Sequence, residues 1–471
     1  MKKPEFKTLF TNEIGNSIPK QQAALIDALL DFLYEKDAKS VFIVKGFAGT
    51  GKTTVLGALV RTFAKINGKT VLLAPTGRAA KVLSSRANKP ASTIHRKIYQ
   101  TTKIAGGGMQ TGLIPNLHKN TLFIIDEASM ISDYSVTNDQ ISSRNFLGDI
   151  MEYVFMGEGC KLIFIGDVGQ LPPVGSEESP ALDEKYLEFH YPYCKIATFQ
   201  LTDVIRQASD SDILFNATQL RNELGGKYPK LTLHNRADMV RVPGAELIEA
   251  IEESYAKVGK ENSIIITRSN KSANQYNQQI RNRILWMEEE VSAGELMMVV
   301  ANNYYWLGEE NKDIGFIANG EMIRIKRVLR SEEIYGFRFL NVTLQLIDYE
   351  NLEPIDAMLL LDTLTLESPN LSRERQKELF FEIEKDFEYI KDKKKRFEAI
   401  MATPHFNALQ VKYGYAITCH KSQGGQWEHV FVDQGYLTED KIDKSFLRWL
   451  YTAVTRATDK LHLVNFDDSF F

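Results

Sequence analysis

The chain carries the stretch Gly46-Phe47-Ala48-Gly49-Thr50-Gly51-Lys52-Thr53, and this stretch decides its fold. Four residues separate two glycines, and a lysine and a hydroxyl residue follow, which is the pattern of a phosphate-binding loop. An apolar run at 41–44 precedes it and a helical run at 54–60 follows it. Glycines let successive N–H groups turn toward an anion, and the helix N-terminus adds partial positive charge. The stretch therefore predicts binding of ATP or GTP.

Each residue type in this loop has an expected task. Lys52 should reach the β- and γ-phosphates, and the hydroxyl of Thr53 should hold Mg²⁺. The alternative is an ordinary glycine-rich turn, which the flanking strand and helix patterns disfavour. We expect nucleotide contacts from Gly46, Ala48, Gly49, Thr50, Gly51, Lys52, Thr53 and Thr54.

Composition fits a large enzyme of several domains. At 471 residues the chain exceeds one hydrophobic core, so two to four domains are expected. Its net charge of −4 gives no general bias toward nucleic acid, so any such binding needs a local basic channel. Cys160, Cys194 and Cys419 have no metal-ligand spacing, and no apolar stretch has the length of a membrane span. We therefore expect a cytoplasmic protein without membrane association.

Short apolar runs alternate with helical stretches along the chain. After the loop, runs lie at 70–74, 121–125 and 161–165, and the last two end in Asp126-Glu127 and Gly166-Asp167. This order predicts an α/β fold with a parallel sheet covered on both faces, and chemistry at the carboxyl ends of its strands.

A second alternating series begins near Phe199 and resumes after Val411. Between its two parts we expect an insertion that contains a β-rich stretch at about 321–361. One long helix, from Ser372 to about Ile400, should follow, because apolar residues recur there at helical spacing. The strands expected in the second series lie at 263–267, 430–432 and 460–464.

Asp126 and Glu127 directly follow an apolar strand. Adjacent carboxylates leaving a strand point in different directions and can perform different tasks. We expect Asp126 to hold Mg²⁺ and Glu127 to orient and deprotonate the attacking water. Alone, the pair could be a solvated strand end, but after a phosphate-binding loop it predicts nucleotide hydrolysis.

Six ordered segments resemble the motifs of superfamily 1 helicases, in particular the RecD-like branch and its compact phage members. The segments are 74–80, 92–95, 126–130, 166–174, 418–424 and 451–457. The resemblance implies an ATP-dependent DNA helicase that moves 5′→3′ on single-stranded DNA and unwinds duplex DNA.

The same resemblance implies two RecA-like domains in tandem. The first would comprise 1–95 and 119–198, with a hairpin, or pin, inserted at 96–118. The second would comprise 199–300 and 411–471, and 301–410 would form an SH3-like subdomain with a helical arm.

Further nucleotide contacts follow from the resemblance. Gln21 matches an adenine-reading glutamine, and Gln170 would sense the γ-phosphate. Arg206 and Arg456 would reach that phosphate from the second domain, for which the fixed charge and fork geometry of arginine are suited. Gln426 stands where the family often has an acidic residue, and it would contact the ribose. The catalytic set implied is Lys52, Glu127, Gln170, Arg206 and Arg456.

The resemblance also implies a path for single-stranded DNA across both domains. Such contacts hold the phosphate backbone and do not read sequence. For the histidines, a structural imidazole is the competing interpretation. The positions that match are Pro75, Thr76, Thr93, His95, Thr418, His420 and Lys421.

Strand separation would need a wedge, and the glycine-rich segment at 98–114 is the candidate. The basic run at 391–396 could touch nucleic acid or be a solvated helix face. Expected partners are single-stranded DNA and a duplex fork, with replication or recombination proteins possible, and the chain is expected to be a monomer. Two alternatives stay open: a nucleotide-gated DNA-binding subunit without unwinding activity, and an RNA helicase.

Overall fold

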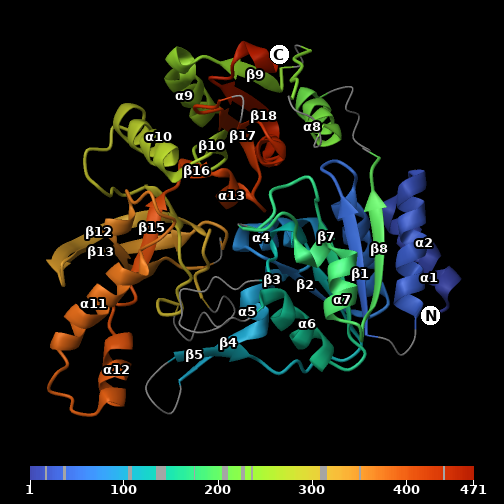
Figure 1. The fold of residues 1–471 in the computed structure, drawn as a ribbon, viewed down its shortest axis with the longest axis horizontal. Helices are drawn as coiled ribbons and strands as arrows, with labels where there is room; N and C mark the ends of the chain where they lie inside the picture. The colour runs from blue at the N-terminus through green and yellow to red at the C-terminus, as the bar shows by residue number, and fades with distance from the viewer. Residues whose placement is uncertain are drawn as a thin grey trace.

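Two parallel sheets organise the chain, each in its own domain (Figure 1). The computed structural model describes residues 1–15, 18–35, 39–103, 109–133, 145–173, 175–203, 211–223, 229–234, 237–307, 316–349, 352–438 and 441–471. Because the chain forms two separate parallel sheets, the expected pair of RecA-like α/β domains in tandem is confirmed.

The first sheet has the strand order β3-β2-β6-β7-β1-β8, and all its pairings are parallel. β1 lies between β7 and β8, so the loop that follows β1 emerges from the interior of the sheet. The strands are β1 (Ser40–Gly46), β2 (Lys69–Ala74), β3 (Ala91–Thr93), β6 (Thr121–Ile125), β7 (Lys161–Gly166) and β8 (Lys195–Leu201).

Alternation along β1 explains how this sheet is covered. Phe42 and Val44 pack with helices on one face, whereas Val41 and Ile43 pack on the other. A continuous apolar run is thus required, because both faces of the strand are buried. The first face carries α1 (Lys3–Ile14), α2 (Lys20–Tyr34), α3 (Lys52–Lys65) and α4 (Gly77–Ala87), and the second carries α5 (Ile94–Ile98), α6 (Phe146–Met156) and α7 (Glu184–His190).

The second sheet has the order β16-β10-β17-β18-β9 and is also parallel. The strands are β9 (Met239–Val242), β10 (Ser263–Thr267), β16 (Ala416–Thr418), β17 (Trp427–Asp433) and β18 (Ala457–Val464). Two apolar clusters cover its two faces. The helices of this domain are α8 (Asp212–Asn222), α9 (Leu247–Val258), α10 (Asn270–Arg283), α13 (Cys419–Ser422) and α14 (Lys444–Val454).

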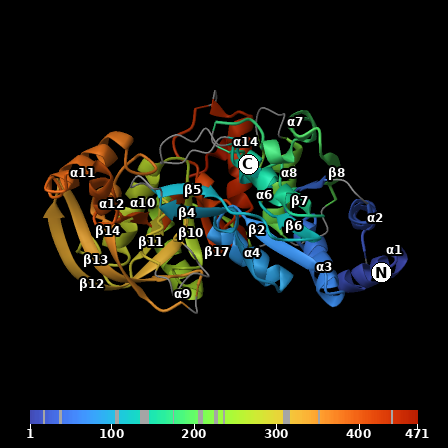
Figure 2. The same cartoon turned by 90° about the horizontal axis from the view of Figure 1, so that it is seen from below.

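A closed five-stranded barrel is inserted into the second domain. Its strands are β11 (Leu296–Val299), β12 (Met322–Ile334), β13 (Phe337–Leu346), β14 (Ile355–Leu360) and β15 (Leu409–Tyr413). β15 closes the barrel by pairing with both β14 and β11. Seen from below, the barrel lies at one end of the molecule and α1 and α2 lie at the other (Figure 2).

The expected single helix from Ser372 to Ile400 is wrong. The segment forms two helices, α11 (Arg373–Lys385) and α12 (Lys393–Met401). The break lies before α12, where the Asp392 carboxylate accepts the N–H groups of Lys394 and Lys395 as a helix cap. Phe380 and Phe397 face each other across the pair, with ring centroids 5.6 Å apart. The apolar spacing is therefore shared by two packed helices, which form the arm at the lower left of Figure 1.

Strand pairing also extends past two expected boundaries. β8 pairs with β1 as far as Leu201, so the first sheet continues beyond 198. The barrel recruits β11 and β15, which lie partly or wholly outside 301–410. In both cases, pairing between segments distant in sequence sets the boundary.

The segment expected to form the pin contains two antiparallel strands, β4 (Tyr99–Lys103) and β5 (Met109–Leu113). Their pairing runs from Tyr99 opposite Leu113 to Lys103 opposite Met109. The glycines expected at its tip lie outside the described residues. Among the helices that the structure describes, none is long and apolar enough to cross a membrane.

Candidate nucleotide site at the domain interface

The loop between β1 and α3 has the backbone geometry of an anion-binding turn. Gly49 and Gly51 adopt φ angles of 77° and 81°, in the region that favours glycine. A Cβ on Gly46 would lie 2.9 Å from Thr50 Oγ1, so a larger residue would displace the loop. Lys52 Nζ donates to the carbonyls of Gly46 and Phe47, at 2.6 and 2.7 Å, and thus lies within the curve of the loop.

Asp126 and Glu127 stand at the carboxyl end of β6, next to β7 in the sheet. Glu127 adopts a left-handed backbone, with φ of 54°, and its N–H donates to Asp126 Oδ1 at 2.9 Å. Burial raises the pKa of both carboxyls, and the positive charge of Lys52 acts against this rise in each case. The two acids therefore share one desolvated site with the lysine of the loop.

The residues present fit a magnesium ion that is held jointly with a nucleotide. Thr53 and Asp126 supply the hard oxygen donors that Mg²⁺ prefers. In the part of the chain that the structure describes, no group of three or more His, Cys, Asp or Glu side chains could hold a metal alone. Mg²⁺ commonly takes only one or two protein ligands and completes its shell with phosphates and water, so this donor set suffices.

Arg456 brings the second domain to this site. Its side chain is buried and donates to the carbonyls of Thr452 and Gly425, at 3.0 and 3.2 Å, and to the Thr455 hydroxyl. Of the neighbouring charges, that of Arg456 lowers the pKa of Glu127 most. A guanidinium from one domain therefore acts electrostatically on the acid of the other.

The loop after β7 provides the remaining polar groups. Gln170 is buried, and its Oε1 has no hydrogen-bond donor among the described residues. The same holds for Ser129 Oγ, and both residues line a cavity of about 40 Å³. Asp167 also lines this cavity, and its Oδ2 lies 3.9 Å from Lys52 Nζ. Gln170 thus has an acceptor that is free to engage a further polar group.

The structure gives Gln21 different partners from the one expected. Its side-chain oxygen accepts the N–H groups of Thr202 and Asp203, at 2.8 and 2.9 Å, and its nitrogen donates to the Thr202 hydroxyl. These bonds tie α2 to the end of β8, and they would have to exchange for an adenine contact. Arg206 lies outside the described residues.

Gln426 links the second domain to Arg86 on α4 of the first domain. Its Oε1 accepts a 2.7 Å hydrogen bond from Arg86, whose other nitrogen lies 3.4 Å from Thr53 Oγ1. The backbone carbonyl of Gln426 accepts from Arg78, which stacks on Trp427 at 3.9 Å from the ring centroid. Sequence reasoning did not assign roles to Arg78 and Arg86, although Arg78 lies within a quoted motif.

Two threonines expected to contact DNA also act as helix caps. Thr76 Oγ1 accepts the N–H of Ala79 at the start of α4, and Thr93 Oγ1 accepts that of Arg96 at the start of α5. A Cβ on Gly424 would lie 3.0 Å from Thr76 Oγ1, so segments 74–80 and 418–424 meet across the domain interface. Pro75 directly precedes Thr76 in the sequence. Thr418 occupies the N-cap position of α13, but its side chain makes no capping hydrogen bond.

The remaining expected DNA contacts have altered ionisation. Burial lowers the pKa of His95 to about 4, and the ring stacks on Phe146 at 4.5 Å, which favours a structural imidazole. Burial also lowers the pKa of His420. Burial and the nearby charge of Lys412 lower the pKa of Lys421 to about 8, and its Nζ donates to Asn319 at 2.6 Å. Lys421 therefore joins the second domain to the barrel.

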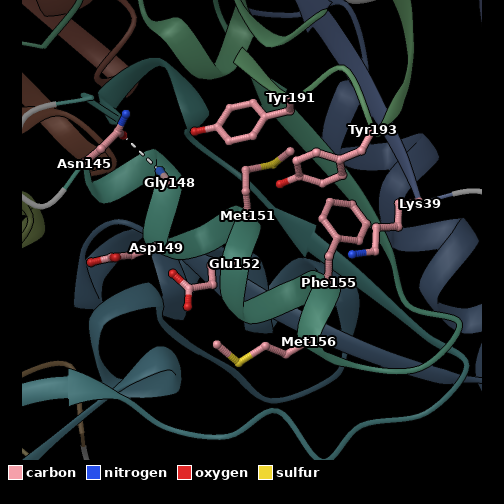
Figure 3. Close-up of a pocket in the computed structure, with 10 residues that line it drawn as sticks. All are labelled: Lys39, Asn145, Gly148, Asp149, Met151, Glu152, Phe155, Met156, Tyr191 and Tyr193. Carbon is pink, nitrogen blue, oxygen red and sulfur yellow. Dashed lines mark hydrogen bonds between the residues drawn. The ribbon is translucent and has the colours of Figure 1, made fainter.

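A second concavity, of about 480 Å³, lies beside α6 on the first domain (Figure 3). Tyr191, Tyr193 and Phe155 line it, together with acidic residues of α6. None of its lining residues belongs to the nucleotide, metal or DNA sets expected from the sequence. It is a separate surface feature.

Comparisons with known proteins agree with this architecture. An AAA domain family matches residues 18–243, and a UvrD-like helicase C-terminal domain family matches residues 413–464. These matches cover the loop and acid pair in the first domain and Arg456 in the second.

The chain is similar to two curated helicases. It is 27% identical over 300 residues to the ATP-dependent DNA helicase dda of Enterobacteria phage T4. The aligned region covers 62% of this chain and 63% of that protein. It is 27% identical over 197 residues to the ATP-dependent RecD2 DNA helicase of Deinococcus radiodurans, covering 42% and 23%. The chain thus spans less than two thirds of the length of either relative.

A crystal structure of a Bacteroides Pif1 helicase with ADP-AlF3 and single-stranded DNA has a TM-score of 0.48 and 15% identity, covering 97% of this chain and 95% of that one. The AAA and UvrD-like helicase C-terminal domain families, the two relatives and the two parallel-sheet domains are consistent with the superfamily 1 helicases that the ordered motifs resemble.

Proposed function

We propose that the chain is an ATP-dependent DNA helicase that moves 5′→3′ along single-stranded DNA and unwinds duplex DNA. The observation that carries the proposal is that the second domain reaches the nucleotide loop of the first: the Tyr451 hydroxyl accepts the N–H of Ala48 at 2.8 Å, and the charge of Arg456 lowers the pKa of Glu127. A site completed from two domains changes when the domains move, which is what a nucleotide-driven motor requires. The names of the T4 and RecD2 relatives support DNA as the substrate.

Each residue of the site has a separate role in ATP hydrolysis. The loop amides and Lys52 bind the phosphates, and Thr53 and Asp126 hold Mg²⁺, which would supply charge neutralisation. Glu127 orients the attacking water and accepts its proton, and Arg456 helps to keep this carboxyl ionised. Arg456 also stabilises the charge that develops during transfer. Gln170 registers the terminal phosphate by donating from its side-chain NH2, while its free Oε1 can accept a hydrogen bond from water.

The strand would run where the two domains meet next to the barrel. Gly424 lies against Thr76 there, and Lys421 donates to Asn319 nearby. Relative motion of the domains would alter this surface and so move the strand. The β4–β5 hairpin would stand at the fork as the wedge, and the chain would act as a monomer, with replication or recombination proteins as possible partners.

Unwinding of tailed duplexes tests the proposal. Duplexes with a 5′ tail or a 3′ tail, in DNA and in RNA, are incubated with the chain and ATP. The proposal predicts ATP-dependent opening of the 5′-tailed DNA duplex alone, and loss of opening in Glu127→Gln with nucleotide binding retained. Binding of DNA with ATP turnover but no opening would favour a nucleotide-gated subunit, and preferential opening of RNA would favour an RNA helicase.

A further inference from the structure

The Tyr451 side chain joins the second domain to the nucleotide loop through its single hydroxyl. The phenol accepts the N–H of Ala48 at 2.8 Å and donates to Asp167 Oδ2 at 2.7 Å. A backbone N–H can only donate and an ionised carboxylate can only accept, so the phenol proton must lie toward Asp167. One side chain of α14 therefore bridges two loops of the first domain.

Close packing holds this phenol in place. Tyr451 is 1% exposed, and a Cβ on Gly169 would lie 3.0 Å from its ring. The same Cβ would lie 3.2 Å from Phe47 of the nucleotide loop. The absence of a side chain on Gly169 thus allows the ring to reach the loop.

Asp167 extends the contact to the phosphate-binding lysine. Its Oδ1 accepts the N–H of Gly169 at 2.9 Å, and its Oδ2 lies 3.9 Å from Lys52 Nζ. The hydroxyl of Tyr451 therefore contacts a carboxylate that itself neighbours the lysine. If Lys52 moves when phosphate binds, the electrostatic interaction of Lys52 with the Asp167 carboxylate changes, and this alters the hydrogen bond between Asp167 and Tyr451.

α14 connects the phenol to Arg456. The next residue on the helix is Thr452, and its backbone carbonyl accepts a 3.0 Å hydrogen bond from the Arg456 side chain. The Thr452 hydroxyl accepts the N–H of Leu171, so the helix contacts the first domain at adjacent positions. The placement of α14 against the nucleotide loop thus also sets where Arg456 lies.

We infer that Tyr451 is a positioning residue for hydrolysis: its hydroxyl couples the nucleotide loop to α14 and thereby sets Arg456 against Glu127. The inference rests on the proposed function, because it concerns the same ATP site. It assigns the coupling to one hydroxyl, which can be removed without removing the ring.

Tyr415 provides a matched control. It is also fully buried, and its hydroxyl likewise accepts a backbone N–H, from Leu296 at 3.2 Å, and donates to a carboxylate, Glu295 Oε1 at 3.0 Å. These bonds lie in the barrel region. Tyr415→Phe therefore removes the same kind of hydroxyl away from the nucleotide site.

The experiment compares single-turnover ATP hydrolysis with single-stranded DNA in the wild type, Tyr451→Phe and Tyr415→Phe. Loss of two hydrogen bonds, one to a charged group, should lower the maximal rate of Tyr451→Phe by at least about tenfold. Affinity for a fluorescent ADP should change by less than about threefold, because the phosphate contacts remain. Tyr415→Phe should keep the wild-type rate.

A double variant separates positioning from general stability. If Tyr451 acts through Arg456, adding Tyr451→Phe to Arg456→Lys should lower the rate by less than about twofold further, whereas independent sites would show additive effects. Additive effects, equal rates for the two phenylalanine variants, or failure of Tyr451→Phe alone to fold would each overturn the inference. Absence of DNA-stimulated turnover in the wild type would instead overturn the proposed function.

Discussion

The Gln423 side-chain amide donates a 2.7 Å hydrogen bond to the carbonyl of Leu171 across the domain interface. Leu171 follows Gln170 directly, and its own N–H donates to the Thr452 hydroxyl at 2.9 Å. The second domain therefore holds both backbone groups of the residue beside the expected phosphate sensor. Gln423 lies in the segment expected to contact DNA, so this bond is a short route between the two sites.

Gln423→Leu should uncouple these sites. The change leaves the buried Leu171 carbonyl without its donor, which should cost about 1–2 kcal/mol of unfolding free energy. Stimulation of ATP turnover by single-stranded DNA should fall several-fold while nucleotide affinity is retained. Steady-state turnover over a DNA titration measures the effect.

Gln410→Leu is the control for this variant. The Gln410 side chain accepts the N–H of Leu371 at 2.9 Å, within the barrel insertion. It should lose comparable stability but keep DNA stimulation. Full DNA stimulation in Gln423→Leu would show that the bond only supports the interface.

Arg456→Ala should nearly abolish hydrolysis. Arginines that reach a transferring phosphate are commonly worth about 10³–10⁵ in rate, whereas nucleotide affinity depends mainly on the loop. We therefore expect a rate loss of at least about 10²-fold in single-turnover assays, with ADP affinity changed less than about tenfold. Arg241→Ala removes an arginine of the second domain that contacts the Phe466 carbonyl and Asp468, and it should behave as wild type. Collapse of nucleotide affinity with normal turnover per bound ATP would make Arg456 a binding residue.

Shortening the β4–β5 hairpin should separate translocation from unwinding. Tyr99 donates to Asp149 at 2.6 Å and Leu113 packs on the first-domain core, so both must stay. Replacing 101–111 by a short Gly-Ser turn should preserve DNA-stimulated turnover and sharply reduce opening of a 5′-tailed duplex. Both activities are measured on one preparation. Unchanged unwinding would make the hairpin an ordinary connection and direct the search for a wedge to the barrel and arm.

Glu321 should make stability depend on pH. Burial, with a smaller contribution from the negative charge of Asp348, raises the pKa of this carboxyl to about 8. Its Oε2 has no hydrogen-bond partner among the described residues, and a Cβ on Gly77 would lie 2.9 Å from its Oε1. The folded chain therefore keeps a proton that the unfolded chain releases above about pH 4.5. Unfolding free energy should fall as pH rises from about 4.5 to 8.

Glu321→Gln should remove this component, since glutamine stays neutral. One unit of pKa shift corresponds to about 1.4 kcal/mol, so the variant should gain a few kcal/mol over wild type at pH 9 and little at pH 5. Urea unfolding at the two pH values gives the difference. Glu295→Gln, which breaks the buried ion pair with Arg281, should instead destabilise at both pH values. An equal effect of Glu321→Gln at both pH values would contradict the assignment.

The sequence predicted the sheets well because local composition determined them. The run at 121–125 coincides with β6, and that at 263–267 coincides with β10. Both are buried on both faces, so they carry uninterrupted apolar residues with polar residues at their ends. The arm was mispredicted because its apolar spacing continues through the turn, and only the cap at Asp392 marks the second helix.

The interface could not be predicted in the same way. Tyr451, Asp167 and Ala48 lie in three separate motifs, and their hydrogen bonds depend on how two domains pack. No periodicity within one segment encodes such a contact. The barrel boundaries share this limit, because β11 and β15 pair with each other from distant parts of the chain.

Directional movement on single-stranded DNA tests the central claim most directly. Single strands with biotin at either end are loaded with streptavidin, and its ATP-dependent displacement is measured in the wild type and in Glu127→Gln. The account predicts rapid displacement from the 3′ end, slow displacement from the 5′ end, and neither with Glu127→Gln. Displacement from the 5′ end alone, or equal displacement in Glu127→Gln, would contradict it.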